Sequence, residues 1–171
     1  MSPIQGMSNM VDGMFWDRQA ITAAAANTTL PMFQLPVGVG GKTRQDTNMR
    51  GTGQLPKPEQ FDVHAIRVYF ETLVAADADL LGRQLTIEFS RDNRVLTEWL
   101  AFTLPSGMGV PFVSDTNGIA DMRAVYTFEF PIHLDTQQPF AVNIVCGAIG
   151  AIGANTNIVV VLDGIRYLAV S

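Results

Sequence analysis

The sequence predicts an all-β protein that folds as one domain, on the evidence of its length, its hydrophobic period and its turn residues. Its 171 residues make a chain slightly longer than a typical domain and too short for two full ones. From Leu30 onward, apolar and polar side chains alternate with a period of two, which is typical of half-buried β-strands. Residues that favour turns interrupt this alternation at the intervals found in sandwiches and barrels. We therefore expect one β-domain built from short, successive strands.

Residues 1–28 differ from the rest of the chain and are predicted to form an N-terminal arm, followed by the β-domain over residues 29–171. The segment holds four methionines, the adjacent residues Phe15 and Trp16, and an alanine-rich end. Two interpretations stay open: a frayed terminus with one helical turn, or an extended arm that docks Phe15 and Trp16 on a neighbouring subunit. The first residues contain neither a basic stretch nor a continuous apolar stretch, so no signal peptide is expected.

Eight segments are predicted as strands, and helix potential is limited to the arm and to residues 74–81. The strands are residues 29–35, 61–74, 84–91, a segment that starts at Arg94, and residues 110–114, 123–134, 140–147 and 157–170. The apolar positions change parity after Val63 in the second of these strands, which indicates a β-bulge near Ala65. In residues 123–134 the aromatic face, which includes Phe128 and Phe130, is expected to lie in the core.

A tight hairpin is predicted where Asp92 and Asn93 separate two strands, because both residues tolerate a positive φ. A two-residue turn sets Leu85, Ile87 and Phe89 opposite Leu100, Glu98 and Leu96. Glu98 then interrupts an otherwise apolar face. Either it lies near a sheet rim or the register is slipped, or its carboxylate pairs with an arginine of this or an adjoining subunit.

The strand count and the uneven connections favour an eight-stranded jelly-roll β-sandwich. Some connections are tight turns and others are long loops, as expected when consecutive strands cross between two sheets. A jelly roll is built from eight strands in two sheets.

The sequence predicts no enzyme, no cofactor and no metal site. Residues 36–43 end like a phosphate-binding loop, but Pro36 replaces the first required glycine and no helical pattern follows. His64 and His133 have no ligand spacing, and Cys146 lies among apolar neighbours, as a small buried side chain would. No catalytic residue is therefore assigned.

The uncharged stretch over residues 136–162 raises the alternative of a membrane-spanning helix. Pro139 and three asparagines divide it, and its apolar part, residues 140–154, is shorter than the roughly 20 residues that a span needs. Two strands joined by a glycine-rich loop fit better. The uncharged loop over residues 147–156 is left as a candidate contact with another subunit or with a lipid surface.

The low charge content points to self-association. Charged residues make up 16% of the chain, against about 25% in typical soluble domains. A surface so poor in charge is sticky unless it is covered. The net charge of −5 argues against direct binding of nucleic acid. We expect a homo-oligomer, a dimer or larger.

The segment GQLPKPEQFDVHAIRVYF over residues 53–70, followed by the low-charge strands, resembles viral jelly-roll capsid proteins. In length and in its low-charge strand pattern, the chain is similar to the small major capsid proteins of tailless icosahedral phages that contain an internal membrane. These phages are of the sphaerolipovirus type and include those of Thermus. This resemblance implies a virion shell subunit, made in the host cytoplasm, that packs with its own copies and with a second capsid protein. It also implies an internal membrane beneath the shell.

The candidate subunit-interface residues are Phe15, Trp16, Glu98, Trp99 and Phe112. Exposed aromatic side chains dominate interfaces when they enter a partner's pocket. The parity of Trp99 relative to Leu96 and Leu100 favours outward exposure, although Trp99 could instead belong to the packed face. The alternative function is a β-sandwich recognition module, a carbohydrate-binding or receptor-binding domain in which such aromatics stack on sugars.

Overall fold

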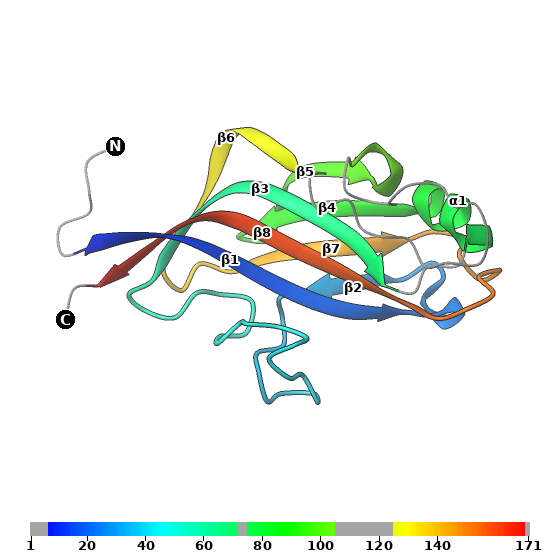
Figure 1. Ribbon diagram of the computed structural model, residues 1–171, viewed down its shortest axis with the longest axis horizontal. Helices are drawn as coiled ribbons and strands as arrows, with labels where there is room; N and C mark the ends of the chain where they lie inside the picture. The colour runs from blue at the N-terminus through cyan, green and yellow to red at the C-terminus, as the bar shows by residue number, and fades with distance from the viewer. Residues whose placement is uncertain (1–6, 72–74, 105–124, 170–171) are drawn as a thin grey trace.

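The computed structural model describes residues 7–71, 75–104 and 125–169, which form two four-stranded antiparallel sheets packed as a β-sandwich (Figure 1). The first sheet has the order β1 (Met7–Ile21), β8 (Thr156–Ala169), β3 (Gln60–Glu71), β6 (Tyr126–Leu134). The second has the order β2 (Thr29–Met32), β7 (Phe140–Cys146), β4 (Leu85–Arg91), β5 (Arg94–Leu100). Helical structure in the described ranges is limited to α1 (Ala75–Gln84) and the short turns η1 (Ala23–Ala25) and η2 (Ala101–Thr103). The predicted all-β class is confirmed.

The chain folds back on itself so that strands from its two ends pair. β1 pairs with β8, β2 with β7, β3 with β6 and β4 with β5, all antiparallel. Two further pairings, β3 with β8 and β4 with β7, join these pairs into the two sheets. Every pairing except that of β4 with β5 therefore brings together residues far apart in the sequence.

The core lies between the sheets and is filled by alternate residues of each strand. In β4 and β7, Ile87, Phe89, Val142 and Ile144 are fully buried, while their sequence neighbours are half-buried. This is the alternation that the sequence predicts for a sheet with one covered face. Cys146 is also buried, as expected, and burial raises the pKa of its thiol.

The bulge expected near Ala65 is confirmed. Both pairings of β3 change register between Val63 and Ala65, so His64 is an extra residue in that strand. Side chains on the two sides of the bulge, such as Phe61 and Ile66, therefore both reach the core although their positions differ in parity.

The segment predicted as an arm differs from expectation, because residues 7–21 form the edge strand β1 of the sandwich. Phe15 and Ile21 are buried in the core. The alternation was hidden because one inward position of β1 is the charged residue Asp17 and another is Gly13, which leaves space for the Arg166 side chain. The predicted strand over residues 110–114 lies outside the described residues.

The hairpin turn is confirmed, but the predicted register beyond it is wrong. Arg91 pairs with Arg94, and the two turn residues Asp92 and Asn93 have φ values of 53° and 59°. The pairing then shifts between Phe89 and Ser90, which leaves Leu96 as an extra residue in β5. The slipped register thus explains Glu98, which lies opposite Glu88 rather than opposite a core residue.

The prediction that Phe130 lies in the core is also wrong, since its side chain is 79% exposed. Ile132 of β6 pairs with Val63, and Thr127 pairs with Ala65. The four residues between Thr127 and Ile132 therefore lie opposite His64 alone, and one of them is Pro131, which has no N–H to donate. β6 arches away from the sheet (Figure 1), and Phe130 is one of these four residues.

Candidate interaction surfaces

The long loop between β2 and β3 projects from the sandwich and is anchored along the outer edge of β1 (Figure 1). The Arg18 N–H donates to the Asp46 carbonyl at 2.7 Å. Asn48 accepts from the Trp16 N–H at 3.0 Å through its side chain and donates to the Met14 carbonyl at 2.8 Å. The loop therefore covers part of the free edge of β1, which limits uncontrolled strand pairing there.

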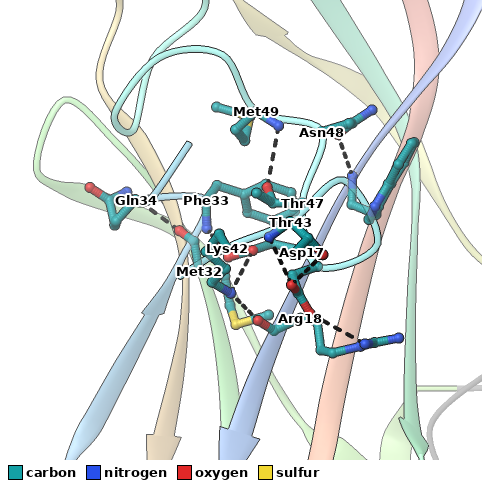
Figure 2. A network of polar contacts seen from close by, with 12 residues as sticks. Asp17, Arg18, Met32, Phe33, Gln34, Lys42, Thr43, Thr47, Asn48 and Met49 are labelled. Carbon is teal, nitrogen blue, oxygen red and sulfur yellow. Dashed lines mark hydrogen bonds and ion pairs between the residues drawn. The ribbon is translucent and has the colours of Figure 1, made fainter. Parts of the chain in front are cut away.

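A buried ion pair between Asp17 and Lys42 holds this loop on the sandwich (Figure 2). Asp17 is 1% exposed, and its carboxylate accepts from Lys42 Nζ at 3.0 Å and from the Phe33 N–H at 2.6 Å. Lys42 also donates to the Arg18 carbonyl. Burial raises the pKa of Asp17, while the Phe33 N–H and the Lys42 ammonium act to lower it.

The same geometry gives Lys42 a structural role in the phosphate-loop-like sequence over residues 36–43. Its ammonium lies against Asp17, and its side chain is only 11% exposed. The residues that follow it form turns and a single bridge, so no helix N-terminus faces the glycines of the loop.

A second clamp fixes the loop through Arg18. Its guanidinium contacts Asp46 at 3.3 Å and Glu71 at 2.7 Å, and so ties the loop to the end of β3. Hydrogen bonds from the side chain and backbone of Thr43 lower the pKa of Asp46. These contacts order the loop before any partner binds, which reduces the entropic cost of binding.

The end of the ordered loop, residues 35–50, is apolar and basic, and we call it the tip loop. Leu35, Val37 and Val39 are each 39–48% exposed. Arg44 and Arg50 are exposed, and neither has an ion-pair partner among the residues that the structure describes.

The outer side of the β4–β5 hairpin is acidic and apolar, and we call it the acidic face. Glu88 and Glu98 lie directly opposite each other across the two strands. Within the described ranges neither carboxylate has an ion-pair partner. Val95, Leu96 and Leu100 are exposed on the same hairpin.

An open groove of about 730 Å³ crosses the outer side of β1 and β8 and reaches the bulge of β3. Its lining includes Asp12, Met14, Trp16, His64 and Asp163. The Asp163 carboxylate is already engaged by Arg67 Nε at 2.5 Å. The groove thus combines an aromatic wall with polar groups.

Asp62 links three strands of the first sheet through its two carboxylate oxygens. One lies 2.6 Å from His133 Nδ1, and the other accepts from the Tyr167 hydroxyl at 2.6 Å. The hydrogen bond to Asp62 raises the pKa of Tyr167 to about 12. Because these groups join β3, β6 and β8, their evident role is to brace the sheet. No group of three or more His, Cys, Asp or Glu residues in the described ranges is placed to hold a metal ion.

The predicted interface residues are placed differently from one another. Phe15 lies in the core of its own domain, with its ring 4.9 Å from that of Phe61, which corrects the expectation that it docks on a neighbour. Trp16 is half-buried at the groove, and Glu98 is exposed on the acidic face. Phe112 lies outside the described residues. Trp16 and Glu98 belong to different sheets, so the structure does not bring the predicted residues together.

The expected outward orientation of Trp99 is wrong. Its ring lies 5.3 Å from Tyr126 and 5.8 Å from Phe128, and it packs against the core. The extra residue Leu96 reverses the parity of β5, so Trp99 lies opposite the buried Ile87. The alternative that placed Trp99 on the packed face is the one observed.

The loop over residues 147–156 keeps its large apolar side chains inside. Ile149 is fully buried and Ile152 is 9% exposed. The exposed residues of the loop are glycine, alanine and asparagine. The loop therefore offers a lipid surface no large apolar side chain to insert. No helix in the described ranges has the length and apolar character needed to cross a membrane.

The sequence pattern missed the tip loop and Phe130 as surface features. Residues 37–40 alternate valine with glycine, which is typical of a flexible loop, and no local signal shows that Lys42 anchors it. No protein-family model matches the chain, and no curated protein matches it significantly.

Proposed function

We propose that the sandwich is a jelly roll. The support is the set of pairings, in which the first strand joins the last, the second joins the seventh, the third joins the sixth and the fourth joins the fifth. A long antiparallel hairpin that is wrapped around a core produces this set, and the wrapping adds the contacts of β3 with β8 and of β4 with β7. Viral capsid proteins, lectin domains and cupins share this architecture.

We further propose that the protein is a capsid shell subunit, a structural virion protein that associates with its own copies and with a second capsid protein. The observation that carries this proposal is the distribution of exposed large apolar side chains. Within the described ranges they lie on four separate surfaces: Leu35, Val37 and Val39 on the tip loop; Val95, Leu96 and Leu100 on β5; Phe130 on β6; and Met10, Val11 and Met14 on β1.

Several separate patches fit a lattice better than a single ligand. A binding module needs one contact surface, whereas a shell subunit meets neighbours on several sides. The low share of charged residues, 16%, supports the same conclusion, because surfaces buried in contacts need few charges for solubility. Many modest contacts that repeat around a closed shell then produce a durable container.

Light scattering across concentration tests the proposal directly. For a shell subunit, the mean mass of the particles in solution should increase as the protein concentration rises. A protein that stays monomeric up to the highest soluble concentration would contradict a self-associating shell role.

The second candidate function is a recognition module for carbohydrates, and the groove at Trp16 favours it. An aromatic wall beside carboxylates suits a hydroxyl-rich ligand, and the volume of about 730 Å³ lies within the range of ligand sites. A glycan array separates the two functions. Specific glycan binding by a monomer, lost in Trp16→Ala, would support the module and replace the shell role.

A further inference from the structure

We propose that copies of this chain associate head to tail, with the tip loop of one subunit docked on the acidic face of the next. This inference rests on the proposed shell function and names the two surfaces that meet. The occupant of the acidic face is a second copy of the chain.

Among the residues that the structure describes, no basic side chain forms an ion pair with the carboxylates of the acidic face. Glu88 lies opposite Glu98 on β5 and opposite Asn143 on β7. Like charges directly across an antiparallel pair destabilise a sheet. Thr86 and Ser90, the outward neighbours of Glu88 on β4, are uncharged. The unfavourable pair is thus available for a basic group from outside the chain.

The tip loop carries the complementary charges. Its other charged residues are already paired, Lys42 with Asp17 and Asp46 with Arg18. Arg44 and Arg50 are left to face outward, and a guanidinium is well suited to a carboxylate because it can donate two parallel hydrogen bonds.

Apolar and basic groups lie side by side on the tip loop. The Val37 N–H donates to the Met49 carbonyl at 3.1 Å, which brings Val37 beside Arg50. The Gly38 N–H donates to the Lys42 carbonyl at 2.8 Å, which brings the apolar tip close to the segment that carries Arg44. The acidic face has the matching arrangement, with exposed leucines next to glutamates.

The positions of the two surfaces exclude their contact within one chain. The tip loop leaves β2 and lies along β1, whereas β5 is at the opposite edge of the second sheet from β2. Figure 1 shows the loop and the β4–β5 hairpin on opposite sides of the sandwich. Two different surfaces that meet in this way form a heterologous contact, which continues into rings or extended lattices.

Charge reversal tests the pairing. The face variant is Glu88→Arg/Glu98→Arg, and the loop variant is Arg44→Glu/Arg50→Glu. Matched controls are Glu129→Arg on β6 and Lys57→Glu, which reverse exposed charges outside both surfaces. Solution mass is measured for the wild type, each variant and an equimolar mixture of the face and loop variants, and melting temperature shows that each variant is folded.

We expect each double variant to associate about ten-fold or more weakly than the wild type, because two attractive pairs become repulsive. The controls should associate like the wild type. The mixture should regain association, since the reversed face then meets the reversed loop, and the unchanged face meets the unchanged loop.

Four outcomes would overturn the inference. If both double variants associate like the wild type, the surfaces are wrong while the shell function stands. If only the face variant loses association, or if the mixture fails to regain it, the face binds a basic partner other than the tip loop. If the wild type itself stays monomeric, this inference and the shell function both fail.

Discussion

Replacing Lys42 with methionine should destabilise the protein strongly, because it leaves a buried carboxylate without its cation. The Asp17 and Lys42 side chains are 2% and 11% exposed. Removal of one partner from a buried ion pair costs about 3–5 kcal/mol. Asp17 keeps the Phe33 N–H at 2.6 Å, so we expect the lower end, about 3 kcal/mol. For a chain of this length that loss lowers Tm by about 6–12 °C.

Urea denaturation of Lys42→Met and of a second variant measures this loss. The second variant, Asp17→Asn/Lys42→Met, removes both charges and retains a side-chain oxygen that can accept from Phe33. It should recover to within about 1 kcal/mol of the wild type, because a buried pair can be replaced by uncharged groups at little cost. A Lys42→Met variant as stable as the wild type, or a double variant no better than Lys42→Met, would refute the reasoning.

The deficit of Lys42→Met should depend on pH. Burial already raises the pKa of Asp17 above 3.8, and Lys42 is one of the groups that lower it. Without Lys42 the pKa rises further. A carboxyl group whose pKa is higher in the folded state binds protons on folding, so its ionisation costs stability as pH rises. The deficit should therefore shrink as pH falls from neutral through the raised pKa, and a deficit constant over that range would contradict this.

Three further predictions follow from close contacts. Gly164→Ala places a Cβ 1.9 Å from the Asp62 carbonyl oxygen and should cost about 3 kcal/mol in urea denaturation; a loss within about 0.5 kcal/mol argues against this packing. Trp99→Ala should lower Tm, with a loss of about 2 kcal/mol in the free energy of unfolding, because the indole packs on Tyr126; an unchanged Tm would contradict this packing and indicate an exposed Trp99. Asp62→Asn should bring the pKa of Tyr167 down from about 12 toward 10.0, as ultraviolet titration of the phenol would show. Because the folded pKa is the higher one, the wild type loses stability as pH rises from 10 through about 12, and Asp62→Asn should reduce that loss; an unchanged titration would contradict the hydrogen bond.

Most strands could be predicted from the sequence because alternation is a local property. Residues in β3, β4 and β7 point to opposite sides in turn, so a covered face leaves a period of two in the sequence. The bulge at His64 was also visible, since it shifts the phase of the alternation within a single strand.

The failures at Asp17 and Phe130 occur where a contact distant in sequence decides which side a residue faces. Nothing in residues 7–21 shows that Asp17 can be buried, because its cation is Lys42 on another segment. Phe130 is exposed because four residues of β6 lie opposite one residue of β3. The tip loop was missed for the same reason, since the exposure of its apolar residues depends on how Lys42 and Asp17 hold the loop.

The amino-acid sequence alone determined the β class, the approximate strand positions and the turn at Asp92 and Asn93, because these depend on neighbouring side chains and on local backbone preferences. Only the tertiary structure decided the order of strands in the two sheets and the face on which Trp99 and Glu98 lie. A single unpaired residue such as Leu96 exchanges the two faces of a strand, and whether it is unpaired is set by the strand it meets.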